Sequence, residues 1–583
     1  MKKITTSIAC LTGILVLAPA GSAALVEERA YEPVVIPAYK INIAALRNQP
    51  VDDIHLYAYD AGGDSWIPMP FQIDEKTLGP DPFSEGNNRW NYFIPAEWSE
   101  IDTFNVTDHD KIFNSHDELV FMVRDLGDRV VSGAWIDDAE SRNRGRIEIE
   151  VKDPLESGLA TYAYIYLSST LSEPVPRPYD FDYDAARDSI STAAYAVDIS
   201  DNGVIEDIIL KTPGTAPVDI FDTQKIRVSG IYSTIFQIPL TINEQILYFV
   251  EGGIYSNGET AVVRLLREAK MGIGLPIEDF NPIFPITAKF YPYGGTISGG
   301  ARLTEEDLAR YLPLGSNIIM RDLRQSWDFN AAAAGMKFYN KRNDGLLIDG
   351  QPDVIDSLIK VMPEQPFPIS EWTLTSGAQG SMFSLIRFKE SNWGEVSLYY
   401  YDQSAGGQPD SGSFGDEDTG DGQSYGDQGI SFRAFGASGI TLELDFSAYF
   451  LPVPDLGTGD GTALAQTVEN PVSFRAALST DVAPIDGAGA PYSFELAQNY
   501  PNPFNGETRI VYSLPRAGEV ILEIYSAGGR RVRTLVSGSQ TAGPHHAEWD
   551  GRDNGGAETA SGIYFCRLRA GGSMETRKLL LIK

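Results

Sequence analysis

The chain has 583 residues, with 46 Lys+Arg against 80 Asp+Glu and a formal net charge of −34. This length exceeds what one hydrophobic core supports, so it predicts several domains. The strong negative charge repels phosphate groups, which excludes nucleic-acid binding and disfavours attachment to anionic membranes.

Residues 1–23 have the pattern of a secretory signal peptide. Lys2 and Lys3 precede the apolar run Ile8–Ala18, and the small residues Gly21–Ala23 follow it. The apolar run is too short to span a bilayer, and no later stretch reaches about eighteen apolar residues. We therefore expect an exported protein whose mature chain has no transmembrane segment.

Residues 24–151 and 155–452 predict an N-terminal β-sandwich-like domain and a larger β-rich domain, which together form the passenger. Apolar and polar residues alternate with period two in many short stretches, as in half-buried strands. The clearest are 54–59, 119–123, 162–167, 205–210, 246–250, 261–266, 382–388, 396–401 and 440–449. One short helix is expected at 304–312. The fold class is therefore mostly β, a multidomain set of antiparallel β-sandwiches.

Two further passenger segments predict loops. Residues 404–429 are rich in glycine and acids and contain no base, which is typical of an excursion between two strands. Residues 453–491 shift to Gly, Ala, Thr and Pro, which predicts a linker.

Three strings in the passenger are distinctive: WIPMPFQIDE at 66–75, DELVFMVRDLGD at 117–128 and GLLIDGQPD at 345–353. Together they resemble pieces of an uncharacterised extracellular module. The resemblance implies no activity.

Two groups of carboxylates have the density of oxygen-ligand loops. The first is Asp344, Asp349, Asp353 and Asp356, interrupted by glycines, and the second is Asp108, Asp110, Asp117 and Glu118. Loops of this composition can present oxygen ligands to Ca²⁺, although neither has the spacing of an EF-hand. Calcium is the one cofactor that the sequence suggests, and solvated turns are the alternative explanation.

Motifs for covalent catalysis are weak. Gly422–Gly426 spells G-x-S-x-G, but it lies in the acidic loop rather than between a strand and a helix. His55, His109 and His116 do not form a metal-binding motif. A glycosidase needs only two suitably spaced carboxylates, so an enzyme stays open as an alternative. Aromatic residues make up 11% of the chain, and exposed rings such as one from Tyr399–Tyr401 could stack on sugars.

The last ninety-odd residues, 492–583, contain the most specific pattern. They open with a proline- and asparagine-rich motif that neither a helix nor a sheet can continue through, made of Asn499, Pro501, Asn502, Pro503, Phe504 and Asn505. Short alternating strands follow, with a hairpin at Gly528-Gly529. This spacing predicts an immunoglobulin-like β-sandwich. The single thiol of the mature chain, Cys566, is expected in its core.

Charge separates this tail from the passenger. From Pro491 onward there are 11 Lys+Arg against 9 Asp+Glu, which leaves 35 against 71, or −36, for the rest of the chain. The acidity therefore belongs to the passenger.

The tail resembles the C-terminal sorting domain of type IX secretion cargo, an Ig-like domain similar to that of flagellar hook-assembly proteins. The resemblance rests on QNYPNPFN, IYSAGGRRVRTL, AGPHHAEWDGRDNGG, SGIYFCRL and the basic-aliphatic final strand. Gly506 and Ser526 depart from the usual pattern. The resemblance implies export across the outer membrane by the secretion machinery, which would then be the partner of this domain.

The sequence thus predicts a secreted cell-surface protein whose passenger is a binding or structural module, with extracellular glycans as a ligand class. An extracellular polysaccharide hydrolase or lyase is the first alternative. A surface-layer or filament subunit is the second.

Overall fold

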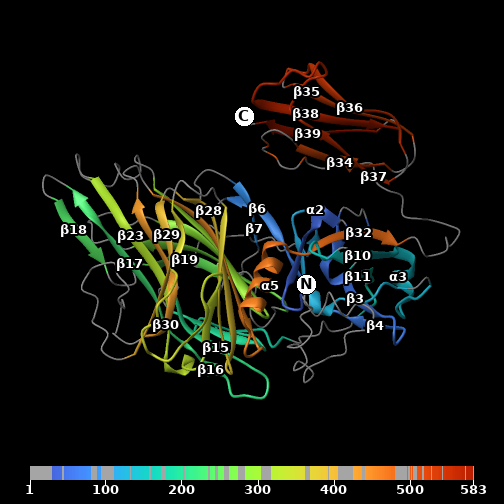
Figure 1. Cartoon of the computed structure of the whole chain (residues 1–583). Coiled ribbons are helices and arrows are strands. Elements are labelled where there is room, and N and C mark those ends of the chain that lie inside the picture. Colours follow the sequence, from blue (N-terminus) through green and yellow to red (C-terminus); the bar gives the residue numbers. More distant parts are fainter. Residues whose placement is uncertain are drawn as a thin grey trace.

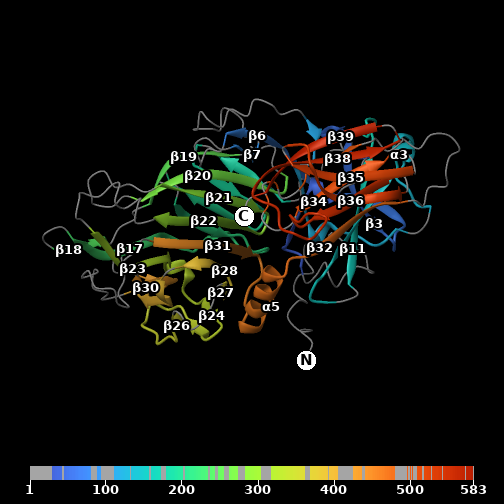
Figure 2. The ribbon, with the colours of Figure 1, turned by 90° about the horizontal axis from the view of Figure 1, so that it is seen from above.

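The computed structural model is a set of antiparallel β-sheets with a few short helices (Figures 1 and 2). It describes residues 29–41, 45–46, 48–80, 88–92, 111–130, 133–156, 159–171, 179–184, 186–200, 204–233, 237–242, 247–254, 262–273, 283–303, 317–361, 368–391, 393–404, 424–435, 440–479, 495–496, 499, 502, 504, 508–514, 518–526, 528–540, 543–571 and 573–581. The predicted signal peptide and the predicted helix at 304–312 lie outside these residues. The predicted fold class is confirmed.

The N-terminal part is built on a five-stranded sheet. Its strands, in order, are β32 (Ser473–Ser479), β10 (Arg146–Lys152), β11 (Ala160–Leu167), β3 (Ile54–Asp60) and β4 (Ser65–Pro68). A three-stranded sheet accompanies it, with β1 (Pro33–Pro37), β9 (Glu118–Met122) and β5 (Gln72–Asp74). Apolar side chains from both sheets, among them Ile36, Phe121 and Ile149, are completely buried in one core. Burial of this apolar surface is what holds the two sheets together.

Short elements complete this part of the chain. They are α2 (Ala38–Ile41), β2 (Gln49–Pro50), a 3-10 turn at Val51–Asp53, β6 (Lys76–Pro80), β7 (Asn88–Tyr92), β8 (Ile112–Phe113), a 3-10 turn at Val123–Asp125 and α3 (Ala139–Arg144). The Asp138 side chain caps α3 by accepting a hydrogen bond from the Ser141 N–H at 2.6 Å.

This sheet corrects two predicted boundaries. A boundary between residues 151 and 155 would divide the antiparallel pair β10–β11, in which Arg146 lies opposite Tyr166. The predicted linker, 453–491, contains a helix, α5 (Thr458–Glu469), and β32, which pairs with β10 along its whole length. The averaged composition of the segment concealed the alternation of Phe474, Ala476 and Leu478 in β32, whose first two side chains pack against the N-terminal core.

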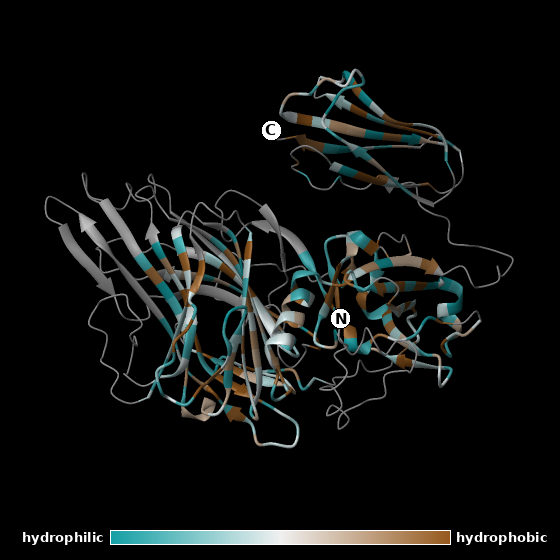
Figure 3. Cartoon of the chain, viewed as in Figure 1, coloured by the Kyte–Doolittle hydropathy of each residue, from teal (hydrophilic) through white to brown (hydrophobic). Residues whose placement is uncertain are grey.

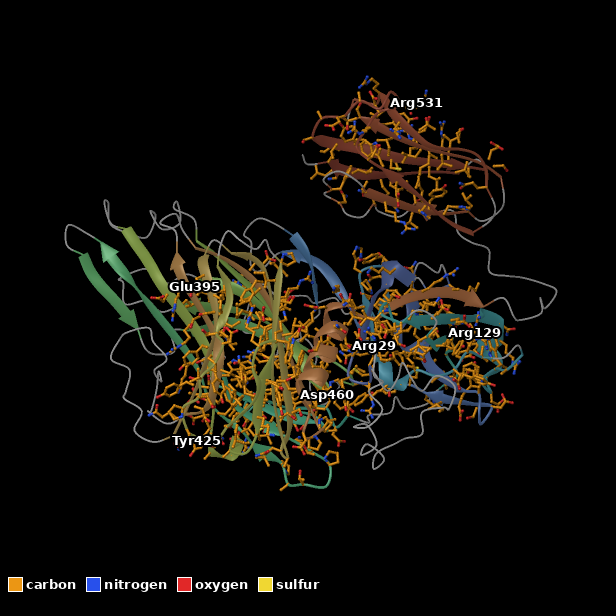
Figure 4. The ribbon with its side chains drawn as sticks, viewed as in Figure 1. Arg29, Arg129, Glu395, Tyr425, Asp460 and Arg531 are labelled. Atoms are coloured by element: carbon orange, nitrogen blue, oxygen red, sulfur yellow. The ribbon has the colours of Figure 1, made fainter. Side chains whose placement is uncertain are left out.

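A buried arginine fixes this return of the chain. Arg29 donates to Asp153 at 2.8 and 2.6 Å, to Glu32 at 2.7 Å and to the carbonyl of Asn470 at 3.0 Å. Glu32 accepts a further bond from the backbone N–H of Val472 at 2.7 Å. Figure 4 labels Arg29 within this part of the chain. The start of the described chain and the segment before β32 are thereby joined through one guanidinium group.

The larger part contains three sheets within the described residues. The first has nine strands, in the order β19 (Leu247–Ile254), β20 (Leu265–Ile273), β21 (Ile283–Tyr291), β22 (Gly294–Leu303), β31 (Ile440–Leu451), β28 (Gly380–Ser391), β27 (Ile369–Gly377), β24 (Lys337–Asn340) and β25 (Asp344–Leu347). The second has six, β18 (Gln237–Ile242), β17 (Phe221–Ser233), β23 (Asn317–Phe329), β30 (Ser424–Phe435), β29 (Trp393–Gln403) and β26 (Leu358–Val361). The third has β12 (Asp182–Asp184), β13 (Ser189–Ser191), β14 (Tyr195–Ile199), β15 (Ile205–Leu210) and β16 (Val218–Asp219). A 3-10 turn at Ala331–Ala333 follows β23.

The nine-stranded sheet is covered on both faces. On one face Phe446 of β31 packs edge-on against Trp327 of β23 in the six-stranded sheet, with ring centroids 4.9 Å apart. On the other face α5 packs against Trp372 and Phe383. A side chain at Gly461 of α5 would meet the ring of Trp372 at 2.5 Å, so glycine allows this close approach. Strand residues of both parities are therefore buried in this sheet.

Most of the alternating stretches form strands at or near their predicted positions. The stretch at 261–266 is the exception, because β20 begins only at Leu265. The predicted loop 404–429 is shorter than expected, because β30 begins at Ser424; residues 405–423 lie outside the described part of the chain.

The first two distinctive strings meet at the junction between the N-terminal and larger parts. β5 pairs with β9, which places Asp74 opposite Glu118. Arg264, which precedes β20, donates to Asp74 at 2.6 Å and to Glu118 at 2.7 Å. Gln72 accepts from the backbone N–H groups of 262–264 and donates to the Arg264 carbonyl at 2.9 Å. These strings therefore supply the polar residues that join β5 and β9 to the larger part.

The C-terminal part is a sandwich of two sheets. One has β33 (Glu495–Leu496), β34 (Thr508–Leu514) and β37 (Gly543–Trp549). The other has β36 (Arg531–Gln540), β35 (Gly518–Ser526), β38 (Gly562–Ala570) and β39 (Ser573–Leu581). Figure 3 shows hydrophobic and hydrophilic residues alternating along these strands. Gly529 has φ +79° in the β35–β36 turn, as the predicted hairpin requires.

Candidate functional site: the C-terminal domain

The proline- and asparagine-rich motif lies against the final strand of the chain. Asn502 donates from its side chain to the Lys578 carbonyl at 3.2 Å and accepts from the Leu580 N–H at 2.8 Å. The backbone N–H of Phe504 donates to the Leu580 carbonyl at 3.0 Å, and Phe504 forms a parallel bridge with Leu581. The motif therefore occupies backbone hydrogen-bonding groups on the edge of β39 that would otherwise be unpaired.

One further residue of the motif, Asn499, is buried. Asn499 is 3% exposed and donates to the Thr508 hydroxyl at 2.9 Å, at the start of β34. Pro501, Pro503 and Asn505 lie outside the described residues. The described residues of the motif thus bind the segment before β34 to two strands, β34 through Asn499 and β39 through Asn502.

Removal of the Asn502 side chain should loosen β39. In Asn502→Ala two hydrogen bonds to the strand are lost, which we expect to cost about 1–2 kcal/mol. Hydrogen exchange of the 573–581 amides in the full-length protein should be faster. Asn502→Asp, which keeps the acceptor for Leu580 and loses the donor, should have a smaller effect. Equal exchange in all three proteins would contradict this role.

Aromatic packing fixes the motif to the core of the sandwich. Trp549 is completely buried, and its ring centroid lies 5.5 Å from Phe504 and 5.0 Å from Tyr564. Its indole N–H donates to the carbonyl of Arg552 at 2.9 Å. Cys566 is buried beside these rings, as predicted, and burial raises the pKa of its thiol to about 12. This thiol is a core residue and not a reactive group.

The first predicted calcium set does not gather into a site. Asp344 accepts from the Thr458 hydroxyl, while Asp349 and Asp356 accept from the backbone N–H groups of Gln351 and Leu358. Burial and the charge of Asp349 raise the pKa of Asp353. Among the described residues, no three acidic, histidine or cysteine side chains form a group that could hold a metal ion.

The loop that carries this set is held instead by a residue that the sequence did not single out. The buried carboxylate of Asp402, on β29, accepts from the backbone N–H groups of Asp349 and Gly350, each at 2.9 Å. Burial raises the pKa of Asp402 to about 6. Nothing in the local spacing around Asp402 indicates this contact, because its partners lie more than fifty residues earlier.

The second calcium set is used in structural contacts where it is described. Asp117 accepts from the backbone N–H groups of Lys76 at 3.0 Å and Asn114 at 2.7 Å. Glu118 pairs with Lys76 at 2.5 Å and with Arg264 at 2.7 Å. Asp108 and Asp110 lie outside the described residues. The oxygens of Asp117 and Glu118 thus already have donors within the protein.

The ionisation of Glu118 predicts acid sensitivity of the junction. Burial alone would raise its pKa, but the charges of Arg264 and Lys76 outweigh burial and lower the pKa from 4.5 to about 2. A carboxyl group whose pKa is lower in the folded state stabilises the fold fully above the unfolded pKa, and this contribution is lost as pH falls. The midpoint temperature of thermal unfolding should therefore decrease as the pH is lowered from 4.5 to 2. Glu118→Gln should make this dependence of the midpoint on pH weaker. An unchanged slope in the variant would contradict it.

The serine of the G-x-S-x-G string is buried in the sheet. Ser424 is the first residue of β30, has no exposed surface and donates to the buried Asp328, which also pairs with Lys225. Burial and the charge of Asp427 raise the pKa of Asp328 well above its usual range. Ser424 is therefore part of a buried polar network and cannot be reached by a substrate.

The histidines have structural environments where they are described. His55 Nε2 lies 3.0 Å from the Ser168 carbonyl. Burial, helped by the charge of Lys76, lowers the pKa of His116 to about 4, so this ring is neutral at physiological pH. His109 lies outside the described residues.

The described aromatic residues are mainly packed inside the protein. Tyr399 and Tyr400 are buried and Tyr401 is half-buried. The expectation that one of these three rings is exposed is therefore wrong. Both faces of β29 are covered, which the period-two pattern could not show. Trp66, Trp135 and Tyr164 surround the buried guanidinium of Arg146, with centroid distances of 5.6, 5.0 and 5.3 Å. This aromatic cluster holds a cation of the chain itself.

One protein-family model matches the C-terminal part of the chain. Residues 501–573 match the FlgD Ig-like domain family. No match was found among curated proteins. No helix of the described residues is both long enough and apolar enough to cross a bilayer.

Two solved structures from Porphyromonas gingivalis show weak similarity. Dimeric latent PorU is 11% identical, with a TM-score of 0.14, and the match covers 62% of this chain and 34% of PorU. PorZ, a surface component of the type-IX secretion system, is 11% identical, with a TM-score of 0.12, and the match covers 74% of this chain and 62% of PorZ. The chain thus spans less than two thirds of either protein, and similarity at this level carries no argument about its function.

Proposed function

We propose that this chain is a secreted cell-surface protein, exported by the type IX secretion system with residues 492–583 as its sorting domain. The observation that carries the proposal is the FlgD Ig-like match at 501–573 in a domain whose opening motif is folded onto its last strand. The motif and the final strand, which the resemblance in sequence emphasised separately, form one unit in three dimensions.

The partner of this domain is then the outer-membrane secretion machinery, and the location of the protein is the cell surface after removal of residues 1–23. The charge distribution supports separate roles for the sorting domain and the passenger, since the tail has a net charge of +2 and the rest of the chain −36. An acidic passenger is soluble and resists association with anionic surfaces during transit.

The passenger acts, in this proposal, as a structural or binding module. Its N-terminal and larger parts are joined by buried ion pairs at Arg264, and its start is fixed by Arg29. Glycans are the proposed ligand class for binding. The described aromatic side chains do not add support, because most of them are buried and a ring must be exposed to stack on a sugar. A hydrolase or lyase would need a pair of accessible carboxylates. Among the candidate carboxylates described above, the contacts do not single out such a pair.

The proposal is tested by transplantation. A soluble reporter with residues 1–23 before it and residues 492–583 after it should reach the surface of a host that has the type IX system. It should stay in the periplasm of a matched strain that lacks the system. A reporter that reaches the surface equally in both strains would refute the assignment.

A further inference from the structure

The outer face of the four-stranded C-terminal sheet has an unusual side-chain composition. Strand register identifies its members, because residues opposite one another in β35, β38 and β39 share a face. Val520, Leu522 and Ile524 of β35 point into the core, so Glu523 and Tyr525 lie on the outer face with their partners Arg567 and Phe565. We call this surface the basic face. Its members include Ile521, Glu523, Tyr525, Arg531, Ile563, Phe565, Arg567, Arg569, Met574 and Lys578.

A buried glutamate organises the cations of the basic face. The Glu523 side chain is 3% exposed, and it pairs with Arg531 and with Arg569, each at 2.9 Å. Tyr525 donates to Glu523 at 2.7 Å, and the guanidinium of Arg567 lies 4.7 Å from the Tyr525 ring centroid. Burial would raise the pKa of Glu523, but the hydrogen bonds from Tyr525 and the two arginines lower it, so the carboxylate stays charged.

The arginines are held in place but still accessible. The side chain of Arg531 is 58% exposed and that of Arg569 is 47% exposed (Figure 4 labels Arg531). A guanidinium has five N–H donors, and each of these two arginines gives one to Glu523 in the contacts above. Side chains that are already ordered lose less conformational entropy when they bind a carboxylate. The geometry therefore prepares this face for an anionic group.

Apolar side chains on the same face indicate which kind of anionic partner fits. Ile563 is 44% exposed and Met574 is 60% exposed, and Met574 lies opposite Arg569. Protein interfaces are enriched in Arg, Met and aromatic residues, whereas recognition of a phosphate-rich polymer needs basic side chains alone. A second copy of the face would be repelled, because its four bases outnumber Glu519 and Glu523.

We infer that the basic face is a docking surface for an acidic protein surface of the export machinery. The inference rests on the proposed function and adds to it the face that is read and the chemistry of its reader. The motif at 499–505 and the basic face would have different roles: the motif secures β39, and β39 supplies Met574 and Lys578 to the surface.

The test uses full-length protein in its type IX host, with two variants that alter the face in independent ways. Ile563→Asp with Met574→Asp removes apolar contacts. Glu523→Gln with Arg531→Gln and Arg569→Gln removes the charge network without stranding a buried carboxylate. Val354→Asp, at a side chain that is 94% exposed in the larger part, is the matched control. Unchanged hydrogen exchange of 573–581 shows that the variants are folded.

We expect both face variants to reduce the fraction of the protein found at the cell surface by about tenfold or more, because residues at the centre of an interface contribute most of its binding energy. The control variant should be exported normally. A photocrosslinker at position 574 should yield a product with an outer-membrane protein, lost in the Gln triple variant. Normal export of the folded face variants would overturn the inference but leave the proposed function intact if deletion of 492–583 still blocks export. A crosslink to a glycolipid, or only to the chain itself, would also overturn it.

Discussion

Arg264→Met is expected to destabilise the junction between the N-terminal and larger parts by about 3–5 kcal/mol, because it removes the cation that pairs with the buried Asp74 and one of the two cations that pair with Glu118. Asp74 and Arg264 have no exposed surface, and Glu118 is 8% exposed. The loss should be visible as a lower thermal midpoint in calorimetry of the full chain. The midpoint should fall at neutral pH, where Glu118 is charged.

Two controls separate this charge effect from a loss of packing. Arg264→Met combined with Asp74→Asn and Glu118→Gln removes the arginine together with the charges of both its carboxylate partners and should recover much of the stability. Arg129 forms an ion pair with Glu148 at the surface, and the Arg129 side chain is 68% exposed. Arg129→Met should therefore lower the free energy of unfolding by less than about 1 kcal/mol. A small effect of Arg264→Met alone would contradict a structural role for the two distinctive strings.

Trp549→Ala is the second large effect that we expect. Removal of a fully buried tryptophan typically costs about 3–5 kcal/mol, and here it also removes the contacts with Phe504 and Tyr564. The C-terminal domain should then unfold at a lower temperature than the passenger, with faster hydrogen exchange across 508–581. Export should fail in parallel if the folded domain is what the machinery reads.

Trp327→Phe is a useful comparison, since Trp327 lies in the passenger core against Phe446. It should lower passenger stability without changing exchange in the C-terminal domain. If Trp549→Ala left both the domain and its export unchanged, the link between its core and sorting would be wrong.

Local patterning was sufficient to predict the fold class and most strands. Alternation identifies β3, β11, β15 and the C-terminal strands, because each buries one or both faces against a neighbour. It could not show that β32 crosses more than three hundred residues to pair with β10, since pairing partners leave no mark on local periodicity. Average composition therefore predicts a linker where the structure has α5 and β32.

Polar contacts were harder to predict for the same reason. Asp117 and Glu118 were noted as acids, but their donors Asn114, Lys76 and Arg264 come from three segments. Arg264 itself has no distinctive sequence context. In the tail, by contrast, the motif residues were found from sequence, because proline and asparagine mark the backbone directly. What the sequence left open was their contact with β39.

The most direct test of the central claim is fractionation of cells that express the chain without residues 492–583. We expect a passenger that is folded, has lost residues 1–23 and accumulates in the periplasm, whereas the full chain reaches the surface. Appearance of the truncated passenger at the cell surface, in the same proportion as the full chain, would contradict the account.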